Sequence, residues 1–190
     1  MRILTKDELL LDKAKFISRI RKGVIFIHPT DTIYGIGCSV LSSQAVNKVR
    51  EIKQRRFMPF SILVPSKEWI YENCNTDDKV EEWIKKLPGP YTLILTLKNK
   101  SAIVPEVNNS LRTVGVRIPD HWFSDFVKEL GFPIITTSAN IVGENFMTSL
   151  ENLDDRIKSK LNFIIYEDEK KGRPSTIVDL SKKEPQITKR

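Results

Sequence analysis

The chain has 190 residues, of which 40% are hydrophobic, and 31 Lys and Arg against 24 Asp and Glu give it a net charge of +7. This length predicts a single domain over residues 1–190. The chain has no apolar run near the ~18–20 residues of a membrane helix and no pattern of a secretory leader, so we expect a cytoplasmic protein rather than a membrane or secreted one. The two cysteines lie far apart and the two histidines show no metal-binding spacing, so we expect no metal held by protein side chains. The excess of Lys and Arg fits either a solvated basic surface or a polyanionic partner.

Short apolar runs alternate along the chain with segments of helical periodicity. The runs predict strands at residues 23–28, 60–64, 91–97, 113–118, 133–137, 162–166 and 176–180. The periodic segments predict helices at residues 6–21, 42–53, 77–87, 120–130 and 148–157. This alternation predicts an α/β fold in which helices largely cover the sheet.

Several of these helices begin at residues suited to N-capping. Ser42 precedes the second helix, and Thr76 precedes two aspartates that favour the start of the third. Thr148 and Glu151 have the spacing of a capping box. We therefore expect Ser42, Thr76 and Thr148 to cap their helices.

Polar residues follow the first predicted strand in the segment 28-HPTDTIYGIG-37. Its glycines permit close approach of the backbone, and its hydroxyl groups and carboxylate can orient a small polar ligand. Such a segment is also typical of an ordinary Pro/Gly turn, because Gly-x-Gly without a third glycine is a weak signal.

Cations occur at two further positions. Lys53, Arg55 and Arg56 follow the second predicted helix, where they either complement the helix dipole or hold a triphosphate. Arg117 interrupts an apolar strand, so it needs an anionic partner, either a structural carboxylate or a ligand.

The chain shows no pattern typical of covalent catalysis. It has neither a Gly-x-Ser-x-Gly elbow nor a Walker loop, and His28 and His121 fit structural roles better than catalytic ones. The sequence therefore favours chemistry that depends on positioning and charge stabilisation.

Taken together and in order, these segments resemble the YrdC/TsaC family. The resemblance covers roughly residues 20–180 and rests on 29-PTDTIYGIG-37, 53-KQR-55, 88-PGPYT-92, 114-VGVRIP-119, 138-SAN-140 and 174-PSTIVD-179. It implies a twisted mixed sheet around a basic concave cleft. It also implies an L-threonylcarbamoyladenylate synthase that uses L-threonine, bicarbonate and ATP with Mg²⁺, and releases pyrophosphate.

The resemblance also implies roles for individual residues. Thr32, Arg117 and Ser175 would bind threonine, and Tyr34 would shape the pocket wall. Lys53 and Arg55 would be catalytic, because they hold the triphosphate and counter the charge of the leaving pyrophosphate. The implied ATP-binding residues are Lys53, Arg55, Thr113, Ser138, Asn140, Thr148 and Lys189.

The chain departs from the family pattern in three places. Near Leu63 some members have a histidine that touches threonine, although other members are also apolar there. Met58 stands where the family commonly has a polar residue, in a loop that is one residue short, so that one phosphate contact is either missing or supplied by Arg56. At the chain end, Lys189 or Arg190 takes the place of an arginine usual in the last strand.

The partners that the resemblance implies are a downstream threonylcarbamoyl transferase and, for the modification of tRNA to N6-threonylcarbamoyladenosine, tRNA or double-stranded RNA. Two other interpretations stay open. A basic cleft could bind double-stranded RNA or tRNA without catalysis, although no basic stripe interleaved with aromatic residues supports this. Alternatively, the chain is a paralogue with this fold and an altered reaction.

Overall fold

We describe residues 1–189 of a computed structural model of the chain. Over these residues the strands form one ten-stranded sheet in the order β1-β8-β2-β3-β7-β4-β6-β5-β9-β10. The strands are β1 (Arg2–Leu4), β2 (Phe26–His28), β3 (Gly35–Gly37), β4 (Ser61–Leu63), β5 (Tyr91–Thr96), β6 (Thr113–Arg117), β7 (Ile134–Ser138), β8 (Phe163–Ile165), β9 (Thr176–Asp179) and β10 (Gln186–Thr188). Parallel and antiparallel pairs are mixed, which confirms the expected α/β fold.

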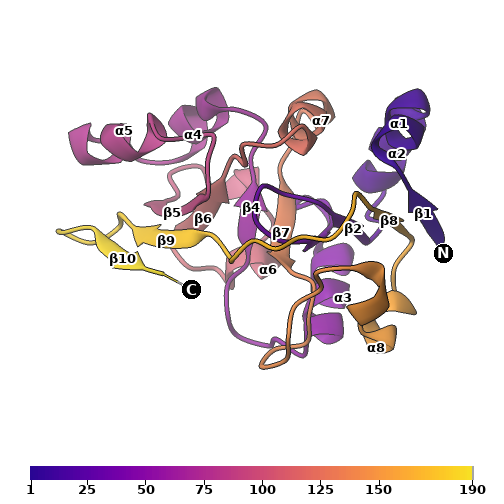
Figure 1. Ribbon diagram of the computed structural model, residues 1–190. Coiled ribbons are helices and arrows are strands. Elements are labelled where there is room, and N and C mark those ends of the chain that lie inside the picture. The colour runs from indigo at the N-terminus through magenta and orange to yellow at the C-terminus, as the bar shows by residue number, and fades with distance from the viewer. Residues whose placement is uncertain (190) are drawn as a thin grey trace.

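Helices cover the sheet on both faces. The α-helices are α1 (Lys6–Leu11), α2 (Lys13–Arg21), α3 (Ser43–Lys53), α4 (Lys67–Asn73), α5 (Asp78–Ile84), α6 (Pro105–Asn108), α7 (Phe123–Leu130) and α8 (Asp155–Lys158), with short 3₁₀ turns at Lys100–Ala102 and Leu150–Asn152. Figure 1 shows α1, α2 and α7 on one side of the sheet and α3 and α8 on the other. No helix of the described residues is both long and apolar enough to cross a membrane.

The core consists of two clusters of buried side chains. One joins α1, α2 and α7 to the strands through residues such as Leu9, Phe16 and Phe126, and the larger one includes the inner faces of α3 and α5. Helix α3 begins where Ser42 Oγ accepts a hydrogen bond from the Ala45 N–H, 3.2 Å away, as predicted. Its buried stripe includes Val46 and Val49 and holds the helix against the sheet.

Two expected caps are wrong by one residue. Asp77, not Thr76, caps α5, because its carboxylate accepts from the Val80 N–H at 2.9 Å. The second capping box joins Ser149 and Asn152 around a 3₁₀ turn, rather than Thr148 and Glu151 around a long helix. Leu153 and Asp154 separate this 3₁₀ turn from α8, and Asp154 caps α8. The predicted helix at residues 148–157 is therefore interrupted, and only α8 is α-helical.

A segment between β8 and β9 passes across the sheet (Figure 1). We call residues 167–175 the crossing segment. Its Glu167 and Asp168 carbonyls accept from the Tyr34 hydroxyl at 2.9 and 2.7 Å, and the Glu167 carboxylate accepts from Trp122 at 2.5 Å. Gly172 lies so close to the backbone of Thr32 that a Cβ atom would clash with it. The segment thereby brings Pro174 and Ser175 to the same region as residues 30–35.

His28 makes folding stability depend on pH. The ring is fully buried and stacks on Phe123, with centroids 4.9 Å apart, and its Nδ1 donates to the Pro29 carbonyl at 3.2 Å. Burial lowers the pKa of His28 to about 3, whereas an unfolded histidine titrates near 6.5. Between these values the unfolded chain binds more protons, so acid lowers the free energy of unfolding, by about 2–3 kcal/mol between pH 6.5 and pH 4.5.

We therefore expect the His28→Phe variant to lose about 2–3 kcal/mol less than the wild type when urea unfolding is measured at pH 6.5 and at pH 4.5. Phenylalanine keeps the stacking on Phe123 and removes the titrating group. Equal losses in the two proteins would contradict the assignment to His28.

Candidate functional site

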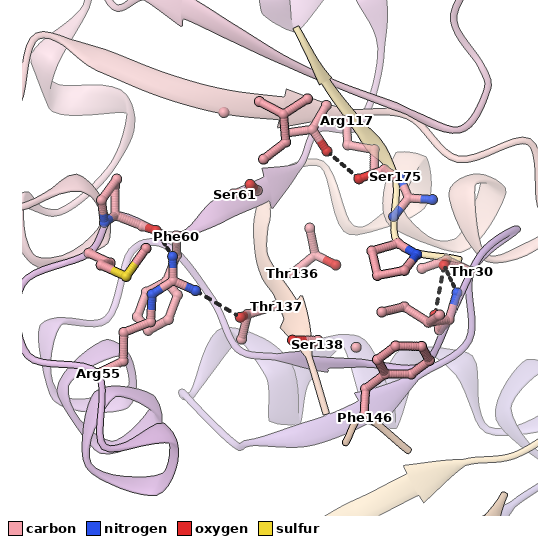
Figure 2. Close-up of a pocket in the computed structure, with 18 of the residues that line it drawn as sticks. Thr30, Arg55, Phe60, Ser61, Arg117, Thr136, Thr137, Ser138, Phe146 and Ser175 are labelled. Carbon is pink, nitrogen blue, oxygen red and sulfur yellow. Dashed lines mark hydrogen bonds between the residues drawn. The ribbon is translucent and has the colours of Figure 1, made fainter. Parts of the chain in front are cut away.

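A cavity of about 480 Å³ opens where the strands β3 to β7 and β9 meet the crossing segment. This volume is in the range of small-molecule sites. Hydroxyl groups and two arginines supply most of its polar atoms, and Figure 2 shows Arg55 at one end and Arg117 near the other, with Thr136, Thr137 and Ser138 between them. The cavity lining comprises Thr30, Ile33, Tyr34, Gly35, Arg55, Met58, Pro59, Phe60, Ser61, Thr92, Ile94, Thr113, Gly115, Arg117, Thr136, Thr137, Ser138, Asn140, Phe146, Pro174, Ser175 and Ile177.

Arg117 stands at the end of β6, and its guanidinium is nearly buried. It forms an ion pair with the Asp31 carboxylate and donates a hydrogen bond to Thr32 Oγ1 at 2.7 Å. The side chains of Arg117 and Asp31 are only 6% and 12% exposed. Asp31 in turn accepts from the Asp120 N–H at 3.1 Å, so both ends of this pair are held by the fold. The structural-carboxylate alternative for Arg117 is thus realised, and its side chain also faces the cavity.

Ser175 and Thr92 lie beside Arg117. Their hydroxyl oxygens are 2.7 Å apart; Thr92 lies in β5, and Ser175 directly precedes β9, which pairs with β5 in parallel. Both residues line the cavity, so the pair places polar hydroxyl groups at its wall.

Arg55 defines the other end of the cavity. Gln54 ends α3 in the left-handed conformation, with φ of 53°, and this turn directs Arg55 away from the helix axis. The guanidinium of Arg55 donates to Thr137 Oγ1 at 3.4 Å and to the Pro59 carbonyl at 2.7 Å (Figure 2). It also lies over the Phe60 ring.

The loop after α3 is held by Arg50, a residue that no sequence motif indicated. This arginine is 9% exposed and donates to the carbonyls of Arg55 and Met58 at 3.1 and 3.0 Å, and to Glu106. The sequence did place Arg50 on the apolar face of α3, one turn after Val46, and an arginine on a buried face needs hydrogen-bond acceptors. Met58 lines the cavity, whereas Arg56 is exposed and outside the lining, so a phosphate contact from Arg56 stays a prediction.

Lys53 is buried, and its ammonium group donates to the chain at residues 138–140 rather than into the cavity. Burial, with Arg55 nearby, lowers the pKa of Lys53 to about 7. Three oxygen acceptors around the nitrogen oppose this effect, because they favour the charged ammonium.

Apart from Lys53, the predicted site residues either line the cavity or lie outside the lining. Those that line the cavity are Tyr34, Arg55, Thr113, Arg117, Ser138, Asn140 and Ser175. Thr32 lies just behind it through Arg117, whereas Thr148 hydrogen-bonds Asn152 and Lys189 is exposed after β10, both outside the lining. Asp31, the partner of Arg117, was not predicted as a site residue, although it lies with Thr32 and Tyr34 in the segment at residues 28–37.

Comparisons with known proteins point to one family. The Sua5/YciO/YrdC family model, described as telomere recombination, matches residues 18–190. The chain is 38% identical over 165 residues to a Methanocaldococcus jannaschii protein provisionally named threonylcarbamoyl-AMP synthase, across 85% of this chain and 76% of that protein. It is 35% identical over 172 residues to the threonylcarbamoyl-AMP synthase of Pyrococcus abyssi, across 87% of this chain and 50% of the relative.

A solved structure agrees with this similarity. The crystal structure of P. abyssi Sua5 complexed with L-threonine superposes with a TM-score of 0.85 at 29% identity, over 98% of this chain and 56% of that one. The chain therefore spans about three quarters of the M. jannaschii relative but only about half of the P. abyssi proteins.

Proposed function

Because this chain belongs to the Sua5/YciO/YrdC family, we propose that it is a threonylcarbamoyl-AMP synthase, which joins L-threonine, bicarbonate and ATP and releases pyrophosphate. The observation that carries the proposal is the presence of two arginines at opposite ends of one hydroxyl-lined cavity. The synthase names of the relatives, and the L-threonine bound by the P. abyssi protein, support it.

Threonine binds at the Arg117 end in this proposal. A planar guanidinium can hold a carboxylate through two parallel hydrogen bonds, and Asp31 and Thr32 already fix its orientation. The paired hydroxyls of Thr92 and Ser175 are suited to the polar groups of the amino acid.

ATP occupies the Arg55 end. Arg55 contacts the phosphates, the hydroxyls of Thr137 and Ser138 lie next to it, and Thr113 and Asn140 bind other parts of the nucleotide. Mg²⁺ arrives with ATP, because this ion is usually bound through substrate phosphates and water. Among the described residues, no group of three or more His, Cys, Asp or Glu side chains could hold a metal ion. Thr148 and Lys189 stay predicted ATP contacts from outside the cavity.

The proposed reaction depends on positioning of the substrates rather than on covalent catalysis. The amine of threonine and bicarbonate form a carbamate with loss of water, and a carbamate oxygen attacks the α-phosphorus of ATP while the bond to pyrophosphate breaks. Holding the carbamate and ATP in one cavity makes the attack intramolecular in effect, and Arg55 offsets the charge that grows on pyrophosphate. We further propose that the product passes to a threonylcarbamoyl transferase for tRNA modification in the cytoplasm, with tRNA or double-stranded RNA a further partner.

Pyrophosphate release from ATP and Mg²⁺ tests the proposal, with threonine and bicarbonate each omitted in turn and L-serine as a control. We expect release only when both are present, and much less with serine. The exposed Lys48→Ala substitution on α3 should leave the rate unchanged. Salt-sensitive binding of double-stranded RNA without pyrophosphate release would favour an RNA-binding protein without catalysis. No signal in either assay would favour a paralogue with another reaction.

A further inference from the structure

Lys53 has an unusual position for a residue of a phosphate site. Its side chain is 1% exposed at the end of α3, and its Nζ atom donates to the Ser138 carbonyl at 2.5 Å, to the Asn140 carbonyl at 2.7 Å and to Asn140 Oδ1 at 3.0 Å. One acceptor belongs to Ser138, the last residue of β7, and the other two belong to Asn140, two residues later.

An ammonium group has three N–H donors and no acceptor. The three oxygens of Ser138 and Asn140 therefore account for all the hydrogen bonds that Lys53 can donate. A phosphate oxygen could bind Lys53 only by displacing one of them. Because the group is buried, the displaced carbonyl would lose its partner without gaining water, which is costly.

The loop after β7, residues 139–147, also contains hydrogen bonds of its own. Asn140 Oδ1 also accepts from Ser138 Oγ at 2.6 Å, and Asn140 Nδ2 donates to the Glu144 carbonyl at 2.6 Å. The backbone of Lys53 takes part, since its carbonyl accepts from the Val142 N–H at 3.3 Å. Lys53 thus stands at the centre of a network that shapes the wall bearing Ser138 and Asn140.

Arg55 differs in each of these respects. It lies two residues later, beyond the left-handed turn at Gln54, and its guanidinium lines the cavity beside Thr137. Two cations that lie two residues apart in the sequence therefore differ in position: Arg55 lines the cavity, whereas Lys53 is buried against residues 138–140.

We propose that Lys53 is a positioning residue, which acts through Ser138 and Asn140 to hold the cavity wall in shape, and that Arg55 alone of the two contacts phosphate. The identity of the phosphate ligand rests on the proposed function. The role of Lys53 in the loop does not, because it is present in the protein without ligands.

Hydrogen exchange of the ligand-free protein tests the loop role directly. In Lys53→Met we expect the amides of residues 139–147 to exchange at least about tenfold faster than in the wild type, with little change in the core strands. The matched Arg55→Met variant should leave these amides unchanged. Wild-type exchange rates in the Lys53→Met loop, or an equal effect of Arg55→Met, would overturn the proposal.

A second measurement uses the wild-type chain, so it remains decisive if Lys53→Met does not fold. Side-chain ¹⁵N resonances of Lys53 and Arg55 are followed while inorganic tripolyphosphate is added. We expect the Arg55 resonances to shift and the Lys53 resonance to keep its position, and a larger shift at Lys53 would overturn the proposal. If tripolyphosphate shifted neither group, the proposed function would be in doubt, whereas hydrogen exchange would still decide the role of Lys53.

The kinetic consequence separates positioning from general stability. In pyrophosphate-release assays well below its melting temperature, Lys53→Met should raise the KM for ATP at least about tenfold while the KM for threonine changes little. Equal effects on both constants would indicate a general loss of structure rather than a local role.

Discussion

Replacing Arg117 by alanine is expected to raise the KM for threonine by about 30-fold or more, with little change in the KM for ATP. Arg117 is nearly buried, and truncating one member of a buried, hydrogen-bonded charge pair costs about 2–5 kcal/mol of binding. Steady-state pyrophosphate release at varied threonine and at varied ATP separates the two constants.

The same substitution also affects folding, because it leaves the Asp31 carboxylate without its partner. We expect a loss of ~3 kcal/mol in the free energy of unfolding, so the kinetics must be measured well below the melting temperature. Arg117→Lys keeps the charge but not the forked geometry, and should recover stability better than threonine affinity. The exposed Arg112→Ala serves as the control. An unchanged KM for threonine in a folded Arg117→Ala protein would refute the assignment.

Replacing Arg55 by alanine is expected to lower kcat by about 100-fold, the scale found when one donor that stabilises charge in the transition state is removed. Arg55 lines the cavity, and in the proposed reaction it faces the charge that grows on the leaving pyrophosphate. Single-turnover pyrophosphate release at saturating ATP measures this step without interference from weakened binding.

Two neighbouring cations provide the comparison for Arg55. Lys48→Ala removes an exposed charge from the same helix and should leave kcat unchanged, so a similar loss there would indicate a general electrostatic effect. Arg56→Ala tests whether this residue supplies the contact missing at Met58. A higher KM for ATP with an unchanged KM for threonine would support that contact, and equal or no effects would exclude it.

The sequence could predict each strand that carries a long apolar run, because burial on both faces of a sheet leaves a local pattern. The strands at residues 2–4, 35–37 and 186–188 escaped prediction for the opposite reason. β1 and β10 are mostly exposed, and β3 contains two glycines, so only pairing with neighbouring strands makes them strands. The helices α4 and α6 were also missed; each has only two buried residues, which gives little helical periodicity.

The sequence by itself determined the order of the motifs and the chemical groups of the site, since these are properties of adjacent residues. Only the tertiary structure decided that Asp31 pairs with Arg117, or that Lys53 turns to Ser138 and Asn140 while Arg55 faces the cavity. These contacts join residues 85 to 87 positions apart. The direction of a charged side chain depends on which acceptors lie within reach once the sheet has formed, because an unpaired charge is costly to bury, and no local pattern records where those acceptors will be.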